Sequence, residues 1–370
     1  MPGRPSGCAI IRMGCFMLHQ LTVSQVRRQT PDAVSIVFDI PQGLAARFAF
    51  TPGQYLTLEA EIGGERVRRA YSICSGLDEG EIRVAVKEIE GGRFSSFANR
   101  CLQAGDVLGV MEPRGRFVLP PAPKEGRIVL AAVAGSGITP VLSIASTVLA
   151  REPHSRLLLV CGNKRRQDML FRTQIAKLEQ DFSPRLLVRR LLSRENGGPG
   201  FGQGRVDGDT LTSILGELDM PVSMVDHALL CGPAEMVANL SAALQRQGLD
   251  SGKILAESFR SAAAAKSEPQ DILPDASTRH VEIRLGGRST IIDARPGETV
   301  VDAARRSGLE VPYSCGGGTC CSCVARIIEG GVETQSDAAL EAWERDAGFV
   351  LTCQSRPAGD RLVVDYDAAF

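Results

Sequence analysis

The sequence predicts a multidomain protein: an antiparallel β-barrel, then an α/β domain with a parallel sheet, then a small α+β domain. Three observations support this prediction. Short strand-like segments separated by turns fill residues 17–122. Strands and helices alternate over residues 123–262. A stretch without sustained periodicity, residues 263–278, then precedes a cysteine-rich unit, residues 279–370.

The first unit is predicted from its strand patterning. Its strand-like segments are β-branched or alternate apolar with polar residues, as half-buried strands do. These segments are Leu21–Val26, Val34–Ile40, Tyr55–Ile62, Val67–Cys74 and Ile82–Ile89. Pro–Gly and Gly–Gly pairs lie at the turns between several of them. Many short strands at regular spacing predict a small antiparallel barrel.

The second unit changes to a strand–helix rhythm. Its short apolar runs are Arg127–Ala134, Arg156–Cys161, Arg185–Leu192 and His227–Cys231. Its helix-like stretches are Ile138–Ala150, Asp168–Gln180 and Ala234–Gln247. Strands that alternate with helices predict a parallel sheet with helical crossovers.

The third unit follows a predicted linker. The segment Ser261–Ser277 contains two prolines and an alanine run, and an extension of the preceding element by that run is the alternative. Two strand-like segments, Val281–Leu285 and Ser289–Ile292, and a helix-like stretch, Thr299–Gly308, then lead into a cysteine loop. We expect an independent small domain here.

Composition excludes several classes of protein. Apolar residues make up 44% and charged residues 23%, which is ordinary for a globular chain. The net charge of −1 gives no global field for nucleic acid or an anionic membrane. No apolar run approaches the roughly 18 residues that span a bilayer. The first 16 residues do not resemble a secretion signal, so we expect a cytoplasmic protein in which they form a loose extension or come from an upstream start codon.

Five of the eleven cysteines lie in the last 56 residues. Cys315, Cys320 and Cys323 are spaced C-x4-C-x2-C, and Cys353 follows after 29 intervening residues. This is the spacing of a plant-type [2Fe–2S] site, in which four thiolates converge on two irons. The glycines after Cys315 allow a loop to wrap closely and to turn its N–H groups towards the sulfides.

Two alternatives compete with a cluster. A zinc site normally pairs two C-x2-C knuckles, whereas only one short knuckle is present. A group of buried free thiols would not need the spacing. Cys321 falls between ligand positions, and we interpret it as a small buried residue. A disulfide scaffold belongs to short secreted chains and does not fit.

A flavin is indicated by two motifs. Arg69, Tyr71 and Ser72 supply, on one predicted strand, a cation for a pyrophosphate, a ring for the isoalloxazine and a hydroxyl near its reactive N5. Alone, an ordinary amphipathic strand could produce this pattern. Gly92 precedes a predicted helix start with Ser95 and Ser96, which suits an anion. A plain N-cap is the alternative for Ser95.

A nicotinamide dinucleotide is indicated next. The run Gly135-Ser136-Gly137-Ile138-Thr139-Pro140 follows a predicted strand, so that its glycines allow a pyrophosphate to approach a helix N-terminus. Pro140 fits the first helical turn, which needs no N–H there. Cys231-Gly232-Pro233 follows a second predicted strand. A glycine turn without a ligand and a small buried cysteine are the respective alternatives.

The coenzyme preference depends on a basic loop. Asn163, Lys164 and Arg165, with Arg166 after them, follow the predicted strand that ends at Cys161. Adjacent cations at a strand end could bind the 2′-phosphate of NADPH. A solvated basic loop is an equal alternative, and NADH then remains the other coenzyme.

These motifs, in this order, resemble the ferredoxin-reductase-type oxygenase reductases that carry a C-terminal plant-type ferredoxin domain. The resemblance covers residues 17–370 and includes PGQYLTLEA, RRAYSICS, VAVKEIEGGRFS, AGSGITP, CGPAEM, VPYSCGGGTCCSC and FVLTCQSRP. Within that group the chain is most similar to the reductase subunits of phenylacetyl-CoA epoxidase systems, which act in phenylacetate catabolism. Many relatives have Arg where this chain has Lys164.

The resemblance implies an FAD-binding β-barrel, an NAD(P)-binding α/β domain and a β-grasp ferredoxin domain. It implies that the residues of the first motif set hold FAD, with Ser95 and Ser96 at the pyrophosphate, and that the second set holds the nicotinamide coenzyme. It implies that Cys315, Cys320, Cys323 and Cys353 hold the cluster. The terminal Phe370 ends the ferredoxin domain, so we do not assign it to cover the flavin.

The implied activity is electron transfer from NADPH, or NADH, through FAD and [2Fe–2S] to an oxygenase. A flavin accepts two electrons as hydride and can release them singly, so no acid or base is required. We expect Ser72 to tune flavin N5. The alternatives are a reductase of another aromatic-ring or di-iron oxygenase, an electron carrier without nicotinamide activity, and a zinc-stabilised interaction protein.

Overall fold

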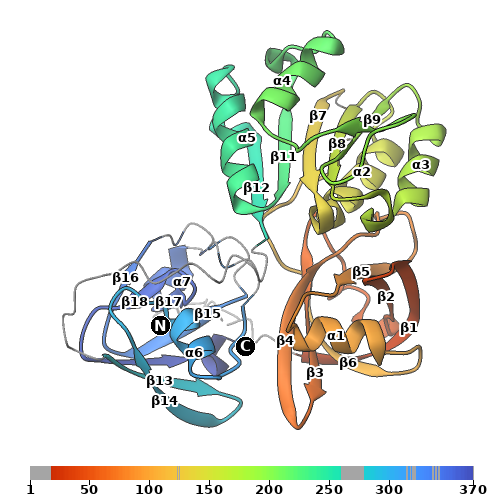
Figure 1. Ribbon diagram of the computed structural model, residues 1–370. Helices are drawn as coiled ribbons and strands as arrows, with labels where there is room; N and C mark the ends of the chain where they lie inside the picture. Colours follow the sequence, from red (N-terminus) through yellow and green to blue (C-terminus); the bar gives the residue numbers. More distant parts are fainter. Residues whose placement is uncertain are drawn as a thin grey trace, which may run out of the picture.

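The computed structural model describes residues 18–122, 124, 126–259, 279–313, 316, 318, 322–335, 337, 340 and 342–369. The expectations for residues 1–16, the linker 263–278 and Phe370 lie outside the described residues. Three sheet-based units follow one another along the chain (Figure 1). The fold class predicted from the sequence is confirmed in all three.

The first unit is a six-stranded antiparallel sheet in the order β4-β3-β6-β1-β2-β5. Its strands are β1 (Leu18–Thr30), β2 (Ala33–Asp39), β3 (Tyr55–Ile62), β4 (Glu65–Ser72), β5 (Ile82–Lys87) and β6 (Val107–Met111). A bridge between Ile73 and Val84 joins the end of β4 to β5, the opposite edge of the sheet. The sheet therefore closes on itself, as the predicted barrel requires.

Helix α1 (Arg93–Arg100) covers the interior of the barrel, and a short 3₁₀ turn, η1 (Gln42–Leu44), lies between β2 and β3. Phe94 and Ala98, four residues apart and so on one helix face, are buried in the same apolar cluster as the inward-facing strand residues. This packing fixes the helix start beside β4, where a flavin was predicted.

The second unit is a parallel sheet in the order β10-β9-β8-β7-β11-β12. Its strands are β7 (Ile128–Ala134), β8 (Arg156–Asn163), β9 (Leu186–Leu192), β10 (Gly202–Gln203), β11 (His227–Gly232) and β12 (Ile254–Ser258). The chain runs outward from β7 through β8 and β9, then returns to place β11 on the other side of β7. The strand order therefore reverses between β7 and β11, where open α/β sheets bind ligands.

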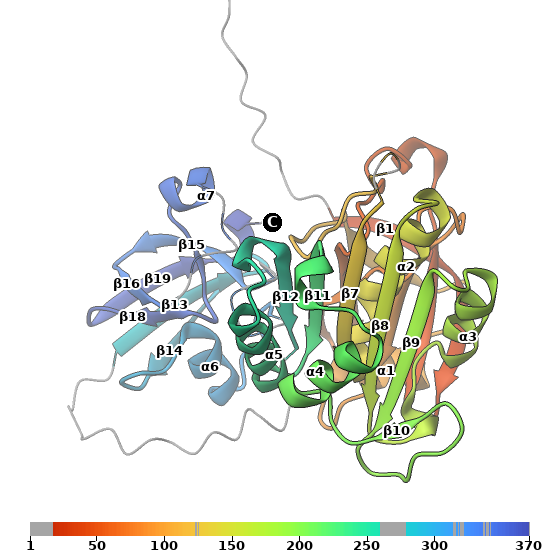
Figure 2. The same ribbon diagram turned by 90° about the horizontal axis from the view of Figure 1, so that it is seen from above.

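Helices cover both faces of this sheet (Figure 2). They are α2 (Ile138–Arg151), α3 (Arg172–Asp181), α4 (Gly208–Glu217) and α5 (Ala234–Arg246), with 3₁₀ turns at Gly135–Gly137, Arg166–Asp168, Val222–Met224 and Ser251–Lys253. In β7, Val129, Ala131 and Val133 pack with α2 and α3. The intervening Leu130 and Ala132 pack with α4 and α5, so the strand is apolar on both faces.

Two local differences from the sequence prediction have physical causes. The predicted helix from Asp168 begins only at Arg172, because Phe171 adopts a left-handed conformation (φ 56°) that interrupts the helical backbone. Strand β6, helix α4 and strand β12 were not predicted. Strands β6 and β12 are short, and β6 and α4 contain glycine, which lowers the propensity for either element.

The third unit is a five-stranded mixed sheet in the order β14-β13-β19-β15-β17. Its elements are β13 (Arg279–Leu285), β14 (Arg288–Ala294), α6 (Val300–Arg306), β15 (Val324–Glu329), β16 (Val332–Thr334), α7 (Ala342–Asp346), β17 (Phe349–Leu351), β18 (Ser355–Pro357), β19 (Arg361–Asp365) and η7 (Asp367–Ala369). Of the strands described in this sheet, only β13 and β19 pair in parallel; β16 and β18 form a separate pair. Helix α6 packs on the sheet, giving the expected α+β, β-grasp-like arrangement.

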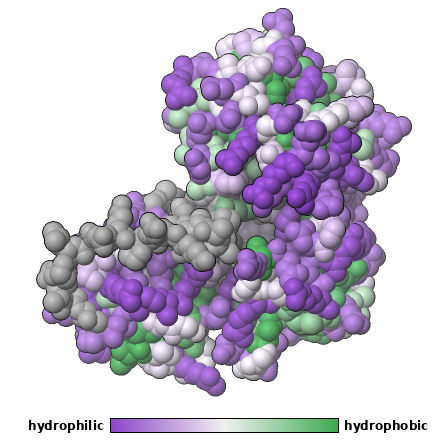
Figure 3. All heavy atoms as spheres, viewed as in Figure 1, coloured by the Kyte–Doolittle hydropathy of each residue, from purple (hydrophilic) through white to green (hydrophobic). Residues whose placement is uncertain are grey.

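Among the described residues, no helix is both long and apolar enough to cross a membrane. On the face shown in Figure 3, hydrophilic side chains predominate over the barrel and the α/β unit, with hydrophobic residues in small separate groups.

Candidate active site

The predicted flavin motif lies on β4, an edge strand that pairs with β3. Ser72 is buried opposite Tyr55, and the Tyr71 ring lies 5.5 Å, centroid to centroid, from Phe94 of α1. Burial raises the pKa of Tyr71 above its usual range, against the opposing charge of Arg69, so the phenol stays neutral. The aromatic ring is thus fixed between β4 and the start of α1.

Arg69 contacts the third unit of the chain. Its Nη1 donates to the carbonyl oxygen of Arg68 at 2.7 Å, and its Nη2 donates to Glu310 Oε2 at 2.6 Å. The guanidinium carbon also lies 5.0 Å from the centroid of the Tyr313 ring. A guanidinium has five N–H groups, so these two hydrogen bonds leave donors for a phosphate. No pattern in the sequence indicated this contact.

The start of α1 suits an anion. Gly92 is the N-cap, no side chain caps the first N–H groups, and a Cβ at Gly92 would lie 2.3 Å from Ser95 Oγ. The Ser95 hydroxyl itself holds the preceding turn, accepting from the Ile89 N–H and donating to the Gly92 carbonyl. Ser96 donates to Glu88. The backbone N–H groups, more than the two hydroxyls, are therefore free for a pyrophosphate.

The two predicted nicotinamide motifs meet at the switch point of the parallel sheet. Gly137 follows β7, and a Cβ there would lie 2.2 Å from the Cys231 carbonyl oxygen and 3.1 Å from the Gly232 nitrogen. Only glycine permits this approach of the two loops. A Cβ at Gly232 would in turn lie 2.5 Å from Met236 Cε. The two loops therefore pack closely at the ends of β7 and β11, the edge at which open α/β sheets bind ligands.

The remaining residues of these motifs form the helix starts. Gly135 has a left-handed φ of 56°, and the Thr139 hydroxyl donates to the Ser136 carbonyl at 2.9 Å. Pro140 lies in the first turn of α2, as predicted. Pro233 is the N-cap of α5. Both helices therefore begin at the same edge of the sheet.

Cys231 lies inside that edge. Its side chain is fully buried, and burial followed by the nearby Glu257 raises the pKa of the thiol well above its ordinary value. The thiol therefore stays protonated, and the backbone around it, more than the sulfur, shapes the cradle.

The basic loop divides into two parts. Asn163 ends β8, and its carbonyl accepts from the Ser193 N–H. Lys164 and Arg165 are exposed, and neither forms an ion pair within the described part of the chain. Arg166 instead pairs with Glu195, through its backbone N–H at 2.8 Å and its Nε at 3.5 Å. Two of the three cations therefore stay available to a phosphate at the end of β8.

Of the four predicted cluster ligands, Cys323 and Cys353 are described and both are buried. Cys315, Cys320 and the non-ligand Cys321 lie outside the described residues. Gly316 and Gly318 have left-handed φ values of 60° and 76°, as the predicted wrapping of the loop requires.

Three residues that the sequence analysis did not select support these cysteines. Thr352 donates its hydroxyl to the Cys323 carbonyl at 2.6 Å and accepts from the fully buried Tyr366 hydroxyl at 2.8 Å. Gln354 Nε2 donates to the Gly316 carbonyl at 3.0 Å and lies 3.6 Å from Cys353 Sγ. Gln354 therefore links the cysteine loop to the distant ligand. The only feature of the sequence that could have indicated a role for Gln354 is its position directly after Cys353.

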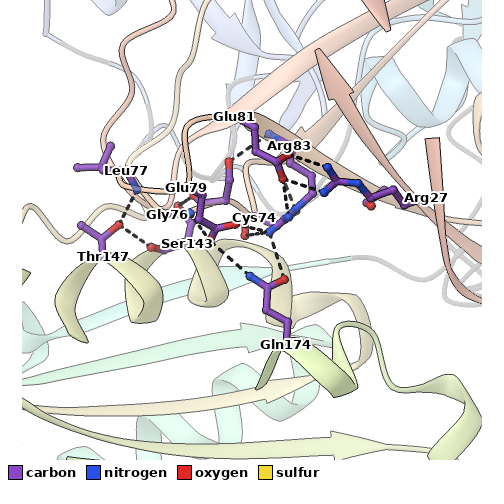
Figure 4. Close-up of polar contacts among 12 residues, drawn as sticks. Arg27, Cys74, Gly76, Leu77, Glu79, Glu81, Arg83, Ser143, Thr147 and Gln174 are labelled. Carbon is purple, nitrogen blue, oxygen red and sulfur yellow. Dashed lines mark hydrogen bonds and ion pairs between the residues drawn. The ribbon is translucent and has the colours of Figure 1, made fainter. Parts of the chain in front are cut away.

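A charged network centred on the buried Arg83 joins the barrel to the α/β unit (Figure 4). The Arg83 side chain, only 7% exposed, donates to Glu81 at 2.6 Å, to Glu79 at 2.8 Å and to Gln174 of α3 at 3.2 Å. Burial raises the pKa of the Cys74 thiol to about 12, against the Arg83 charge, so that it donates to the Arg83 carbonyl as a neutral group. One side chain thus connects β5 to a helix of the next unit.

Helix α2 holds the segment that continues from β4. Ser143 donates to the Ser75 carbonyl at 2.7 Å, and the Thr147 hydroxyl accepts from the Leu77 N–H at 3.1 Å. Figure 4 shows the contact between Thr147 and Leu77. Only a few residues therefore separate Ser72 from the unit that is predicted to hold the nicotinamide.

A second buried ion pair lies at the connection between the two units. Arg127 donates to Glu152 at 2.6 and 3.0 Å and to the Pro120 carbonyl at 2.8 Å, and Glu152 is fully buried. Burial acts to raise the pKa of Glu152, but hydrogen bonds from Arg127, Ser155 and the Ala122 N–H hold it below its usual range. The connecting segment is therefore fixed at both ends.

Comparison with protein families matches all three units. An oxidoreductase FAD-binding domain matches residues 20–119, an oxidoreductase NAD-binding domain matches 132–241, and a 2Fe-2S iron-sulfur cluster binding domain matches 283–358. One subunit of the 1,2-phenylacetyl-CoA epoxidase of Escherichia coli K12 is 40% identical over 352 residues, covering 95% of this chain and 98% of that protein.

The chain belongs to the iron–sulfur flavoprotein reductase family. A further relative, the ferredoxin reductase component of the 3-ketosteroid-9-alpha-monooxygenase of Rhodococcus rhodochrous, is 31% identical and covers 94% of this chain and 96% of its own length. Phthalate dioxygenase reductase shares the fold with a TM-score of 0.58 at 22% identity, covering 94% of this chain and 98% of that one. The chain is therefore an oxidoreductase with FAD, NAD and 2Fe-2S domains.

Proposed function

We propose that this reductase carries electrons from NADPH through FAD and [2Fe–2S] to the oxygenase of a phenylacetyl-CoA epoxidase, in the cytoplasm, during aerobic phenylacetate degradation. The full-length similarity to the epoxidase subunit of Escherichia coli supports the partner. The observation that best supports the proposed electron path is the position of the flavin motif. Within six positions of one segment, Arg69 contacts the ferredoxin domain and Ser75 contacts α2 of the NAD domain.

FAD would bind between β4 and α1. When bound, it supplies hydride acceptance and single-electron release. The residues that we assign to it are Arg69, Tyr71, Ser72, Gly92, Ser95 and Ser96. The uncapped N–H groups of α1 would bind the pyrophosphate together with Arg69, and Tyr71 would lie against the flavin ring. Ser72 would place its hydroxyl near N5.

The nicotinamide coenzyme would bind across the ends of β7, β8 and β11. The residues that we assign to it are Gly135, Ser136, Gly137, Thr139, Pro140, Asn163, Lys164, Arg165, Cys231, Gly232 and Pro233. The glycine contact between Gly137 and Cys231 supports close approach of the coenzyme backbone. Lys164 and Arg165 would bind a 2′-phosphate, which favours NADPH over NADH.

The cluster would be held by Cys315, Cys320, Cys323 and Cys353. Buried Cys323 and Cys353 together with the left-handed Gly316 fit a thiolate site in a closely wrapped loop. We further propose that the domains comprise residues 17–122, 123–262 and 279–370, joined by the linker 263–278.

Cysteine substitutions test the electron path. Cys353→Ala should abolish reduction of the purified epoxidase oxygenase while NADPH-dependent ferricyanide reduction by the flavin stays largely intact. Cys321→Ala, at the position between predicted ligands, is the matched control and should retain both activities and the visible spectrum of the cluster. Parallel loss of both activities in Cys353→Ala would contradict separate flavin and cluster steps.

An anaerobic titration with NADPH and then NADH tests the coenzymes. Bleaching of the flavin and cluster bands by NADPH at lower concentration than by NADH is the expected result. Colourless protein containing zinc would refute the proposal. The similarity to the 3-ketosteroid monooxygenase component favours a second candidate, a reductase of another oxygenase. Coupling rates with the two oxygenases, measured side by side, distinguish these partners.

A further inference from the structure

The ferredoxin domain meets the FAD domain through a small charged contact on β4. Arg69 donates to Glu310 at 2.6 Å, and its guanidinium carbon lies 5.0 Å from the Tyr313 ring centroid. On the same ring, the Arg305 guanidinium carbon also lies 5.0 Å from the centroid. The Tyr313 ring therefore contacts one arginine of its own domain and one arginine of the FAD domain.

This contact has a specific place along the chain. On one side, Arg69 is two residues from Tyr71, about 7 Å along a strand. On the other side, Tyr313 is two residues from Cys315, at most about 7 Å of extended chain. The contact thus joins the aromatic residue assigned to the flavin to the first cysteine assigned to the cluster.

Charge and exposure indicate that the contact is reversible. The Arg69 and Glu310 side chains are 20% and 31% exposed, so water and salt reach them. Neither residue belongs to one of the apolar clusters, and Tyr313 is only partly buried beside one. Such a contact orients a domain without locking it.

We propose that Glu310 and Tyr313 are positioning residues that seat the ferredoxin domain on β4 and so set the distance for electron transfer from flavin to cluster. This inference rests on the proposed function. Arg69 takes part in both sites: three of its five N–H groups remain for the FAD pyrophosphate while one carries Glu310. Seating of the ferredoxin domain therefore occurs beside the flavin phosphates.

The test separates hydride transfer from electron transfer in the holoenzyme. Stopped-flow mixing with NADPH follows flavin reduction and then cluster reduction at their own wavelengths. At low salt, Glu310→Gln should slow cluster reduction up to about fivefold, and Glu310→Arg, which places two arginines against each other, should slow it further. Both variants should leave flavin reduction within twofold of the wild type. Tyr313→Leu should act in the same direction, whereas Tyr313→Phe, which keeps the ring, should not.

The control changes the same charge elsewhere on the domain. Glu329 is 55% exposed and pairs at 3.4 Å with Arg361 of its own domain, so Glu329→Gln and Glu329→Arg should leave both rates unchanged. Raising the ionic strength to about 1 M, where the Debye length is about 3 Å, should slow cluster reduction in the wild type but not in Glu310→Gln.

Small-angle X-ray scattering supplies a readout that is independent of turnover. Glu310→Arg should increase the radius of gyration relative to the wild type and to Glu329→Arg. Unchanged cluster reduction in Glu310→Arg overturns the proposal, and so does slower reduction with unchanged scattering. A wild type whose flavin or cluster is not reduced by NADPH or NADH would instead refute the proposed function.

Discussion

The FAD domain meets its two neighbours in different ways. Towards the NAD domain, the contact is built like a protein core: the Arg83 side chain is 7% exposed, and the fully buried Glu152 accepts from the Ala122 N–H of the preceding domain. Cys74 and Phe117 of the barrel belong to the same apolar cluster as α2. Towards the ferredoxin domain, the described contact is one ion pair and one ring, both partly exposed.

This difference corresponds to two kinds of transfer. Hydride transfer needs reacting atoms about 3–3.5 Å apart and aligned, so the two domains that supply them must be fixed relative to each other. An electron tolerates a wider and less exact gap. A surface ion pair contributes about 0–1 kcal/mol, so the second contact can open and close readily. We therefore expect a larger loss in the free energy of unfolding when the contact with the NAD domain is disrupted than when the contact with the ferredoxin domain is disrupted.

The largest loss of stability is expected from Glu152→Gln. The substitution leaves the Arg127 charge buried without its carboxylate, which costs about 3–5 kcal/mol. The free energy of unfolding is measured by urea denaturation, following the release of flavin fluorescence. Glu329→Gln, at an exposed pair, is the control and should cost less than about 1 kcal/mol. Equal losses in the two variants would contradict a core-like junction.

The contribution of Glu152 should also depend on pH. Its folded-state pKa lies below the unfolded value of about 4.3, so its stabilisation is present above that pH. The stabilisation is lost as the pH falls through the folded pKa. The gap in unfolding free energy between wild type and Glu152→Gln should therefore be constant from pH 6 to 8, as linkage requires, and narrow below about pH 4. A gap that widens on acidification would contradict this sign.

A smaller loss, about 2–3 kcal/mol, is expected from Arg83→Met. Methionine fills most of the volume, but Glu79 and Glu81 lose their common partner; both are partly exposed, which lowers the cost relative to a fully buried pair. Because Gln174 of α3 also loses its contact, flavin reduction by NADPH should slow. Stopped-flow kinetics measure this rate. A stability loss with unchanged flavin reduction would show that Arg83 does not position the NAD domain.

The smallest effect on stability is expected at the ferredoxin contact. Glu310→Gln should change the unfolding free energy by less than about 1 kcal/mol, since both partners are partly exposed. The exposed pair of Arg151 with Asp78 gives a matched reference across the other junction, and Arg151→Gln should have a similarly small effect. Calorimetry of both variants tests this. A loss above about 2 kcal/mol in Glu310→Gln would remove the contrast between the two contacts.

The sequence predicted the cofactor motifs better than the contacts between domains. Gly137 and Cys231 lie in short motifs at the ends of strands, and the parallel sheet brings such ends together. The partners Arg69 and Glu310 are 241 residues apart, and Arg83 and Gln174 are 91 apart. No local pattern marks such pairs, because ordinary surface strands and helices also contain Arg, Glu and Gln.

The sequence also failed to predict several local features of the backbone. The left-handed Phe171 delays the start of α3, although nothing in its residue type predicts that conformation. Strand β6 was missed because it is short and contains Gly109, which lowers the local strand propensity. The need for glycine there is tertiary, since a Cβ would lie 2.8 Å from Leu18. In the third domain, Thr352 and Gln354 gain their roles only from the folding of β17 towards the cysteine loop.

The closure of the barrel by the bridge between Ile73 and Val84 has a consequence for how this enzyme tolerates change. It pins the segment from Arg69 to Ser75 in a single register, and a shift by one residue would turn every side chain of the strand to its opposite face. In the proposed electron path, this one segment contacts both the NAD domain, through Ser75, and the ferredoxin domain, through Arg69. Its position therefore sets the distance from the flavin to each neighbour. An insertion there would displace both at once, whereas the loops far from it can vary in length without altering either distance.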